Sequence, residues 1–360
     1  MKGVFVSSGT GGHIHPAFAI AKVFKKHGSK IYWIGRRNSL EEELATFENF
    51  KFKAIKASGF RGKNIFRKLL SIIALLNSFF VSFIFLRKTN PDFVLTCGNF
   101  SSLGAGIACK FLNISLFIHE QNSVPGTANK LLFGFSDLVF EGFPDAFKKN
   151  SKVVYVGNPL REEILNLINT GSQIKKSHNK KFTLLILGGS QGSVQLNSIV
   201  LKSLKNLEEI KNWKIIHQSG EIDESRLIDF YSKMKVDCKV KSYINDIGKQ
   251  YDTADLVISR AGAMTISELI YMNKPAILLP LPWATDNHQY FNATYMKRLG
   301  LAEIVVSKEE NSEILKKVIS DLASNEEKRL LMAKSAKLDT GKDVAENIFK
   351  KIYEFNKKKS

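Results

Sequence analysis

The chain has 360 residues, of which 44% are hydrophobic and 24% are charged, a composition that excludes a largely disordered protein and is typical of a globular one. Its 53 lysines and arginines outnumber its 34 acidic residues and give a formal net charge of +19, which favours either an anionic partner or a surface that is simply rich in lysine. Three cysteines without a CxxC pair argue against a disulfide framework and a structural zinc site, and no motif indicates nucleic-acid binding.

The first predicted element is a strand over "GVFVSS", which leads through "GTGGH" into a helix whose first turn contains Pro16. Glycines permit positive φ angles and lack a Cβ atom, so backbone N–H groups can surround an anion at the positive end of this helix. The alternative is a turn that only closes the strand against the helix. The stretch becomes polar too early for a signal peptide, so we expect a cytoplasmic protein.

An apolar stretch of eighteen uncharged residues, 69–86, lies between the basic pairs Arg67-Lys68 and Arg87-Lys88. A transmembrane span would put the polar motifs before and after it on opposite sides of a bilayer. This makes a span the least favoured of three alternatives, the others being a core helix and a helix docked on an anionic membrane surface. A helical projection gathers the small residues, which can pack closely on a sheet, into one stripe: Ser71, Ala74, Ser78 and Ser82.

Further strands in "KIYWIG", "DFVLTCG" and "SLFIHE" alternate with helical patterns, which predicts a parallel sheet with helices on both faces. His119, Glu120, Gln121 and Asn122 lie together at the end of the last of these strands, in "FIHEQNSVPGTANK". Ligands bind at the carboxyl edge of such sheets, so this polar cluster predicts a site.

The same pattern restarts after the polar stretch "NTGSQIKKSHNKK" with "FTLLILGGSQGSVQLNSIVLKSL", again a strand, a glycine loop and a helix. We therefore predict an α/β protein with two doubly wound, Rossmann-like domains that face each other across a cleft. The expected domains are residues 1–160 and 161–343, and a last helix at about 344–357 can pack on either. Two glycine loops predict two phosphate-bearing ligands or one large ligand, with the Ser190 hydroxyl donating to a phosphate oxygen.

A third small-residue turn occurs in "SRAGAMTISEL". Its Glu268 can accept hydrogen bonds from a ribose, or it can close a capping box with Thr265 that needs no ligand. "DNHQYFNA" supplies a further polar cluster. No spacing indicates a metal site, so backbone amides and helix N-termini would have to hold a leaving diphosphate.

The ordered motifs "GTGGHIHPAFAIA", "HEQNSVPGTANK", "VGNPLR", "GGSQGSVQLN", "HQSG", "RAGAMTISEL" and "NHQYFNA" resemble those of the MurG family of peptidoglycan glycosyltransferases, family 28. The resemblance implies the GT-B fold and inverting transfer of N-acetylglucosamine from UDP-GlcNAc to the 4-hydroxyl of MurNAc in undecaprenyl-diphospho-MurNAc-pentapeptide, which forms lipid II. It implies no metal or other cofactor. Alternatives are a GT-B transferase with another lipid or small-molecule acceptor and a non-catalytic sugar-nucleotide-binding protein.

Site residues follow from the resemblance by motif. Ser190, Gln289 and the amides of Gly189, Gln191 and Gly192 would bind the UDP diphosphate. Glu268 would bind the ribose, and Ile244 would lie near the uracil. The rest of that pocket would comprise Arg161, Arg260, Ala263, Met264, Thr265, Ile266 and Ser267. The contacts to the GlcNAc portion would come from Thr10, Gly11, Gly12 and Asn122. Motif positions with less definite roles are Asn129, Asn197 and Asn292.

Inversion by direct displacement requires a base beside the attacking hydroxyl. His13 is the first candidate, with His119 and Glu120 as rivals, and the alternative role of His13 is to donate to a phosphate. One motif departs from the family pattern: "CGNFSS" stands where MurG commonly has Gly-Gly-Tyr. This leaves the acceptor-diphosphate role of that loop in doubt, although Asn99 can adopt a positive φ.

The resemblance also implies where the protein acts. In this family the first domain lies against the cytoplasmic membrane, so residues 69–86 are expected to form a docking helix and their basic flanks to contact anionic phospholipid. The transmembrane alternative is thereby dropped. We expect a peripheral protein on the cytoplasmic face of the inner membrane, with other cell-wall synthesis proteins as further candidate partners.

Overall fold

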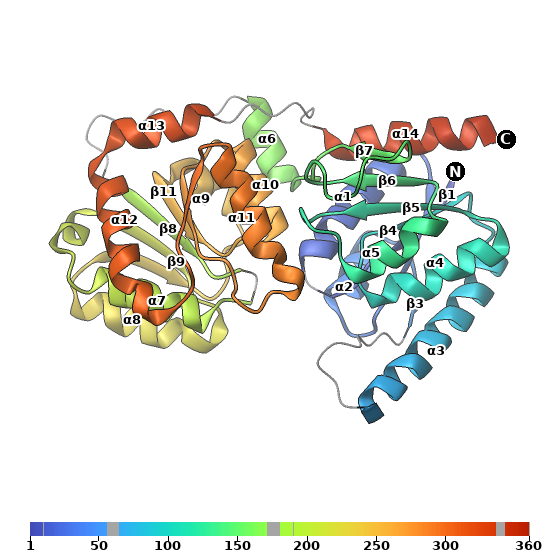
Figure 1. Cartoon of the computed structure of the whole chain (residues 1–360), viewed down its shortest axis with the longest axis horizontal. Helices are drawn as coiled ribbons and strands as arrows, with labels where there is room; N and C mark the ends of the chain where they lie inside the picture. Colours follow the sequence, from blue (N-terminus) through green and yellow to red (C-terminus); the bar gives the residue numbers. More distant parts are fainter. Residues whose placement is uncertain (10, 56–64, 171–180, 190, 336–342, 360) are drawn as a thin grey trace. The chain divides into compact units, whose positions relative to one another are not determined.

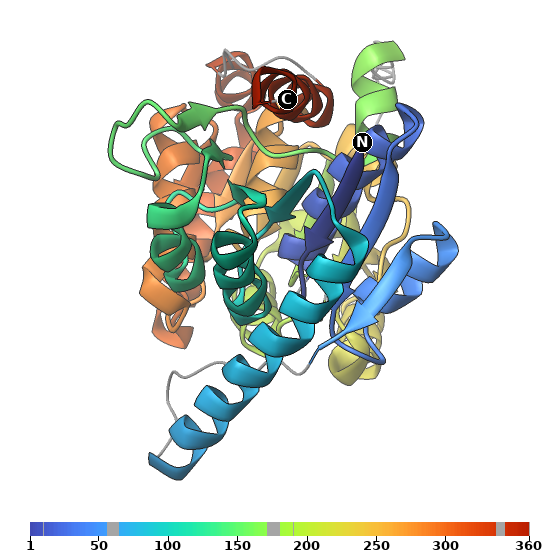
Figure 2. The ribbon, with the colours of Figure 1, turned by 90° about the vertical axis from the view of Figure 1, so that its right-hand side faces the viewer.

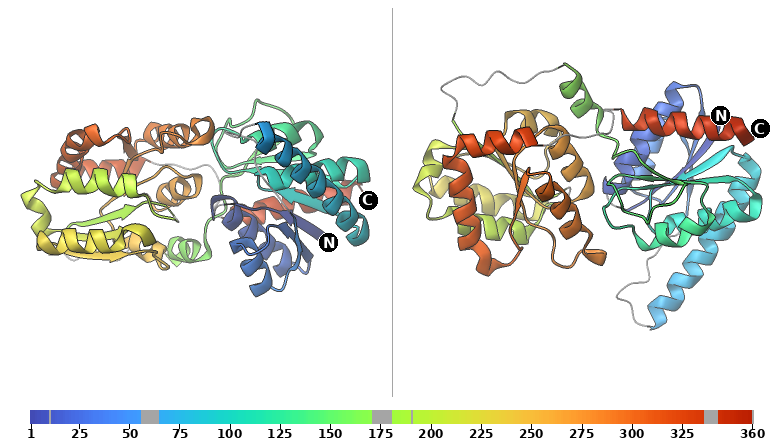
Figure 3. Two further views of the ribbon diagram at one scale, coloured as in Figure 1. Left: turned by 90° about the horizontal axis from the view of Figure 1, so that it is seen from below. Right: turned by 45° about the horizontal axis from the view of Figure 1, so that its top comes forward.

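The computed structural model describes residues 1–9, 11–55, 65–170, 181–189, 191–335 and 343–359. The chain divides into two compact units, Met1–Arg161 with Thr340–Ser360, and Glu162–Asp339. Each unit contains one parallel sheet with helices on both faces (Figures 1 and 3). The predicted α/β class with two parallel sheets is therefore confirmed.

The sheet of the first unit has the strand order β3-β2-β1-β4-β5-β6-β7. All neighbours are parallel, and β1 sits between β2 and β4 with Phe5 opposite Trp33 on one side and Leu95 on the other. The strands are β1 Lys2–Val6, β2 Lys30–Gly35, β3 Lys51–Ala54, β4 Phe93–Thr96, β5 Ser115–Glu120, β6 Leu138–Glu141 and β7 Val153–Tyr155.

The helices of this unit cover both faces of the sheet. The C-terminal helix α14 lies beside α1 (Figure 1). It contributes Phe349 to the aromatic core around Phe24 and Phe93, with the rings of Phe24 and Phe349 4.9 Å apart. The helices are α1 Gly11–Lys26, α2 Leu40–Phe47, α3 Ile65–Thr89, α4 Phe100–Leu112, α5 Thr127–Leu132 and α14 Val344–Lys359.

Helix α3 packs along α4 and projects past it at its N-terminal end (Figure 2). The small-residue stripe faces α4 rather than the sheet, because a Cβ atom at Gly104 of α4 would lie 2.5 Å from Ser78 Oγ and 2.7 Å from the backbone nitrogen of Phe79. Glycine and serine thus allow the two helices to approach closely. Only 17% of the stretch Ser71–Thr89 is buried, so the core-helix alternative is wrong.

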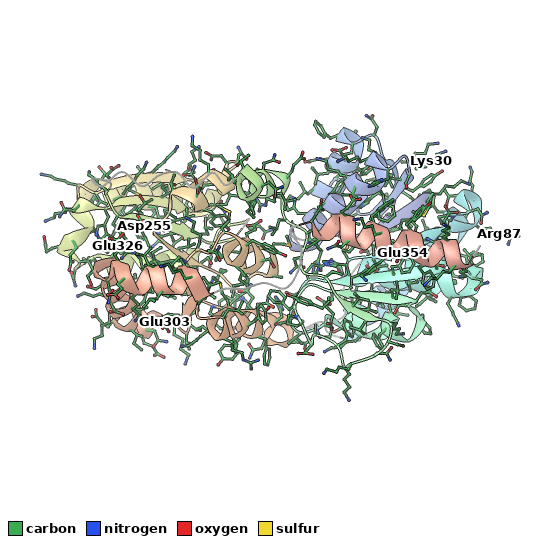
Figure 4. All side chains as sticks on the ribbon, turned by 90° about the horizontal axis from the view of Figure 1, so that it is seen from above. Lys30, Arg87, Asp255, Glu303, Glu326 and Glu354 are labelled. Atoms are coloured by element: carbon green, nitrogen blue, oxygen red, sulfur yellow. The ribbon has the colours of Figure 1, made fainter. Side chains whose placement is uncertain are left out.

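The second unit has the strand order β10-β9-β8-β11-β12-β13, again parallel throughout. Its central strand β8 is fully buried, as its run of leucine and isoleucine predicts. Asp255, labelled in Figure 4, accepts the backbone N–H of Thr183 at 2.8 Å and so joins the start of β11 to the start of β8. The strands are β8 Thr183–Leu187, β9 Lys214–Gln218, β10 Asp237–Lys241, β11 Leu256–Ser259, β12 Ala276–Leu278 and β13 Ala302–Ile304.

Helices also cover both faces of this second sheet (Figure 3). Helices α7 and α12 pack together on one face, where Leu196, Ile199, Leu315 and Ile319 join a fully buried core. The helices are α6 Glu162–Thr170, α7 Val194–Leu204, α8 Glu224–Lys233, α9 Ile247–Thr253, α10 Ala263–Tyr271, α11 His288–Arg298, α12 Ser312–Ser324 and α13 Glu326–Ser335.

Candidate functional site

Both sheets reverse their strand order next to their first strand, between β1 and β4 and between β8 and β11. Loops that leave neighbouring strands in opposite directions at such a point open a crevice at the carboxyl edge, where parallel sheets bind ligands. The first glycine loop, residues 7–12, follows β1, and the second glycine loop, residues 188–193, follows β8. The topology thus places each glycine loop at the expected binding edge of its own unit.

The first glycine loop is tied to the loop that precedes α4. Gly9 has a φ of +108°, and a Cβ atom there would lie 2.4 Å from Asn99 Nδ2. The Asn99 amide donates to the Ser8 carbonyl at 2.9 Å, and Asn99 Oδ1 accepts the N–H of Phe100 at 2.6 Å. Asn99 itself has a φ of +75°, so the expected positive φ is confirmed.

Helix α1 begins earlier than the sequence indicates. It starts at Gly11, so Gly12 lies in its first turn and Pro16 lies inside the helix rather than in the first turn. Pro16 has no N–H for the Gly12 carbonyl four residues before it, so this helical hydrogen bond is missing. Thr10, the other residue assigned to this loop, lies outside the described residues.

His15 lies beside Gly11, and the charge of Arg161 affects its pKa. A Cβ atom at Gly11 would be 3.0 Å from His15 Cδ2. Burial and, secondarily, the positive charge of Arg161 lower the pKa of His15 to about 4. Arg161 therefore adds positive potential at the start of α1, where an anion would be stabilised.

The candidate base and one of its rivals belong to one hydrogen-bonded chain. The Nδ1 atom of half-buried His13 is 2.8 Å from Gln121 Oε1, and Gln121 Nε2 is 2.9 Å from His119 Nδ1. His119 Nε2 in turn is 3.2 Å from the Gly157 carbonyl. His119 is fully buried, and both its ring nitrogens are occupied, so it has no free atom to offer a substrate.

Glu120, the other rival, is surrounded by donors. One carboxylate oxygen accepts from the backbone and side chain of Asn122, at 2.9 and 3.2 Å. The other accepts from the Gly126 N–H at 2.9 Å and from Asn129 Nδ2 at 2.8 Å. Only 1% of Glu120 is exposed, so its carboxylate orders residues 122–129 and is poorly placed to take a proton from a ligand.

The second glycine loop is pressed against the loop after β9. Gly189 and Gly192 have φ angles of +92° and +74°. A Cβ atom on Gly192 would lie 2.4 Å from the Gly220 Cα atom and 2.5 Å from the Ser219 carbonyl. Ser193 begins α7 and accepts the N–H of Leu196. The loop therefore presents its backbone at a helix N-terminus, the arrangement that suits a phosphate. Ser190 lies outside the described residues.

Gln218 joins the two backbone segments that would hold the diphosphate and the uracil. Its Nε2 donates to the Gly189 carbonyl at 2.7 Å, and its Oε1 accepts the N–H of Ile244 at 3.1 Å. Ile244 is 2% exposed, whereas Gln191, at the tip of the loop, is exposed.

Asn197 and His217 belong to a hydrogen-bond network that holds the loop after β9 in place. Asn197 Nδ2 donates to the Ser219 carbonyl at 2.9 Å and to Asp223 Oδ2 at 2.7 Å. Its Oδ1 is 3.1 Å from His217 Nε2, and His217 Nδ1 is 3.0 Å from the Tyr231 hydroxyl. Asn197 is fully buried, so the structure gives it a positioning role behind the second glycine loop.

Arg260 is a buried cation whose hydrogen-bonding partners are all uncharged. Its five N–H groups meet the Ser193 hydroxyl twice, Gln195 Oε1, the Leu279 carbonyl and the Ser307 hydroxyl. Burial lowers its pKa to about 10, so it remains charged at neutral pH. Arg260 therefore contributes positive potential at the N-terminus of α7, where it contacts Ser193 and Gln195.

Helix α10 begins at Ala263 after Gly262, with no side-chain cap. Thr265 lies inside this helix, so the capping-box alternative for Glu268 is wrong. Glu268 is 1% exposed, and its Oε2 accepts from the Tyr251 hydroxyl at 3.1 Å. The helix also carries three other assigned residues that are largely buried: Met264, Ile266 and Ser267.

Helix α11 supplies two amides to the same edge of the second sheet. Gln289 Oε1 accepts the N–H of Leu281 at 2.9 Å, and fully buried Asn292 donates to the Ala261 carbonyl at 3.2 Å. These bonds hold the segments after β12 and β11. Among the described residues, no group of three or more His, Cys, Asp or Glu side chains is arranged to hold a metal ion.

Two family models match the chain: the glycosyltransferase family 28 N-terminal domain over residues 4–141 and the C-terminal domain over residues 183–348. The chain belongs to glycosyltransferase family 28. The predicted glycosyltransferase activity is thereby confirmed. The N-terminal model extends from β1 to β6 of the first sheet, and the C-terminal model covers β8 to β13 of the second.

Individual relatives of this family-28 glycosyltransferase match over most of both chains. A curated relative from Coxiella burnetii, named UDP-N-acetylglucosamine--N-acetylmuramyl-(pentapeptide) pyrophosphoryl-undecaprenol N-acetylglucosamine transferase, is 33% identical over 93% of each chain. A relative of the same name from Nitrosospira multiformis is 38% identical over 83% of this chain and 84% of its own. The crystal structure of Acinetobacter baumannii MurG superimposes with a TM-score of 0.82 at 29% identity, covering 98% of this chain and 100% of that one. The resemblance to the MurG family is confirmed.

Three residues received no role of their own from the sequence, although two of them lie in the quoted motifs. Gln121 belongs to "HEQN" and Gln218 to "HQSG", but an amide has no preferred partner until the fold brings one within reach. Tyr251, which contacts Glu268, lies in α9 and carries no motif signal. A glutamine at the carboxyl end of a buried strand was the signal available for the first two.

The buried histidines predict a pH dependence of stability in this glycosyltransferase. Burial lowers the pKa of His119 to about 4 and that of His217 to about 3, whereas an unfolded histidine titrates near 6.5. The unfolded state therefore binds more protons below pH 6.5, and the free energy of unfolding falls as the pH is lowered. Between pH 7 and pH 5 we expect a loss of about 2 kcal/mol for each histidine in urea unfolding. A His217→Gln variant should show a shallower dependence, and an unchanged slope would contradict this assignment.

Proposed function

We propose that this enzyme transfers N-acetylglucosamine from UDP-GlcNAc to the 4-hydroxyl of MurNAc in undecaprenyl-diphospho-MurNAc-pentapeptide and so forms lipid II. The observation that carries the proposal is the match to curated relatives named for this transfer, at 33% and 38% identity over most of both chains. The geometry of both units supports it, since each glycine loop lies at the binding edge of its sheet.

The donor is assigned to the second unit. The diphosphate would lie on the backbone of residues 188–192 at the N-terminus of α7, with positive potential from Arg260 and the amide of Gln289 nearby. Glu268, oriented by Tyr251, would accept the ribose hydroxyls, and the segment at Ile244 would border the uracil. The neighbouring turn that shapes this pocket comprises Ala263, Met264, Thr265, Ile266 and Ser267.

The acceptor and the base are assigned to the first unit. His13 would remove the proton from the 4-hydroxyl as its oxygen attacks the anomeric carbon, while the bond from that carbon to the UDP oxygen breaks. The departing charge would then be stabilised by the second glycine loop without a metal ion. His13 is favoured over His119 and Glu120 because it alone of the three is partly exposed.

The transfer assay uses labelled UDP-GlcNAc and three acceptors in the presence of EDTA: the muramyl-pentapeptide lipid, the same lipid diphosphate without its sugar, and a soluble muramyl peptide. We expect transfer to the first acceptor and little to the lipid without the sugar. No transfer to the muramyl lipid would overturn the proposed reaction. Loss of all transfer on adding EDTA would overturn the metal-independent mechanism.

The surface of α3 supports a peripheral position on the cytoplasmic face of the membrane. Arg87 and Lys88 end this helix, and Arg87 is labelled in Figure 4. Phe111 of α4 is 71% exposed, and the ring centroids of Phe79 and Phe111 lie 5.7 Å apart. One helix of the described chain has the length and apolar composition of a span, Ser71–Thr89. Its outward apolar side chains are Ile72, Ile73, Leu76, Phe80 and Ile84.

Replacing Ile73, Phe80 and Ile84 together with serine should weaken binding to vesicles that contain anionic phospholipid on the order of 100-fold, because each side chain buries part of its apolar area in the bilayer. Vesicle sedimentation measures this. Ile222→Ser removes an even more exposed isoleucine, 90% exposed, from the second unit and serves as the control. Equal binding by the triple variant and the control would contradict the docking surface.

A further inference from the structure

Gln121 lies between the two histidines of the first unit and is almost completely buried, with 1% of its surface exposed. Its backbone is held in place because Asn158 Nδ2 donates to the Gln121 carbonyl at 2.9 Å. Gly142 leaves the room for this contact, since a Cβ atom there would lie 2.3 Å from Asn158 Oδ1. The side chain of Gln121 therefore extends from a fixed backbone toward His13.

The hydrogens of His119 are determined by its partners. Its Nε2 lies 3.2 Å from the Gly157 carbonyl, which can only accept, so Nε2 carries a hydrogen. Burial keeps the imidazole neutral near pH 7, because the pKa of His119 is lowered to about 4. Its Nδ1 atom is therefore a lone-pair acceptor, and the group 2.9 Å away on Gln121 must be the amide N–H₂.

A second contact fixes the same orientation of the Gln121 amide. Gln121 Nε2 also lies 3.0 Å from the backbone carbonyl of His119, another acceptor, so reversing the amide would place oxygen against oxygen. With the N–H₂ group on the His119 side, Gln121 Oε1 faces His13 Nδ1 at 2.8 Å. An oxygen acceptor there requires that His13 Nδ1 carry the hydrogen.

We propose that Gln121 is the positioning residue of the transfer: it holds neutral His13 in the Nδ1–H tautomer and leaves the Nε2 lone pair as the base. This rests on the proposed function only in taking His13 as the base. A neutral imidazole can carry its hydrogen on either nitrogen, and the tautomer is set by the bond that the other nitrogen makes. His119 completes this arrangement because it fixes the orientation of the Gln121 amide.

The proton balance of the step follows from this tautomer. His13 Nε2 takes the hydrogen of the acceptor hydroxyl as the new carbon–oxygen bond forms and the bond to UDP breaks. The resulting imidazolium keeps its Nδ1–H bond to Gln121 Oε1, whose partial negative charge stabilises it. The proton then leaves Nε2 for solvent once the product has gone, which restores the neutral imidazole.

The direct test is nitrogen NMR of the full chain labelled with ¹⁵N-histidine at pH 8, with the His13 signals assigned by their loss in His13→Ala. We expect a protonated Nδ1 and an unprotonated Nε2 in the wild type, and a mixture of tautomers in Gln121→Met. An Nε2–H tautomer in the wild type would overturn the proposal. This readout needs no activity, so it stands apart from the outcome of the lipid II assay.

Steady-state kinetics provide a second test of the role of Gln121. Gln121→Met keeps the side-chain length and removes all three side-chain hydrogen bonds. We therefore expect kcat to fall by about 10- to 100-fold, with the KM for UDP-GlcNAc within about twofold of wild type. The matched control Gln250→Met removes a partly exposed amide in α9 that donates to Asp246, and should leave kcat unchanged. A kcat of Gln121→Met equal to that of the control, with wild-type transfer intact, would overturn the positioning role alone.

Discussion

A His13→Ala variant is expected to lose about 10²- to 10⁴-fold in kcat for GlcNAc transfer, the range that a positioned base contributes. The KM for UDP-GlcNAc should stay near the wild-type value, because the donor is assigned to the second unit and His13 belongs to α1 of the first. Steady-state transfer to the muramyl lipid measures kcat, and calorimetric titration with UDP-GlcNAc measures donor binding.

The matched control for this variant is His27→Gln, near the other end of α1. His27 contacts Glu346 and stacks on Phe349 of α14, away from the binding edge of the sheet. The His27→Gln variant should transfer GlcNAc at close to the wild-type rate. Near-normal turnover by His13→Ala would remove His13 from the role of base and return His119 and Glu120 to consideration.

Replacing Gly192 with alanine is expected to weaken UDP-GlcNAc binding by at least about 100-fold, the loss that follows when a phosphate loop cannot keep its backbone in place. The new methyl group would meet the Gly220 Cα atom at 2.4 Å at a φ of +74°. Gly220 cannot yield easily, because its N–H donates to the Ser242 carbonyl and the preceding carbonyl of Ser219 is held by Asn197. Calorimetric titration of the variant with UDP-GlcNAc measures the loss.

The control Gly28→Ala separates the steric clash expected in Gly192→Ala from the backbone strain of a positive φ. Gly28 has nearly the same φ, +73°, but nothing lies within 4 Å of an added Cβ atom. It should cost about 1 kcal/mol of stability and leave donor binding unchanged. If Gly192→Ala bound UDP-GlcNAc as well as Gly28→Ala does, the second glycine loop would not hold the diphosphate.

The sequence predicted the features that local chemistry determines. Glycines after a buried strand identified both glycine loops, and the alternation of strands and helices identified two parallel sheets. Asn99 was predicted to take a positive φ because asparagine tolerates that region, and its φ is +75°. Each of these depends on residues close together in the chain.

The sequence could not predict contacts between residues that lie far apart in the chain. Arg260 was expected in the donor pocket, yet its partners come from positions 193, 195, 279 and 307, and only the folded sheet shows that they use all its N–H groups. The periodicity of α3 could not separate a core helix from a docking helix, because both need apolar side chains on most of their faces. The start of α1 was misplaced because Pro16 is usually found in a first turn.

The account is tested most directly by the chemical structure of the product made from UDP-GlcNAc and the muramyl-pentapeptide lipid. Mass spectrometry and proton NMR of the purified disaccharide identify the hydroxyl that was substituted and the anomeric configuration of the new bond. Direct displacement with His13 as base predicts one GlcNAc, β-linked to the 4-hydroxyl of MurNAc, and far less of the same product in the His13→Ala reaction over the same time. An α-linked product, or GlcNAc on another hydroxyl or on no muramyl sugar at all, would contradict it.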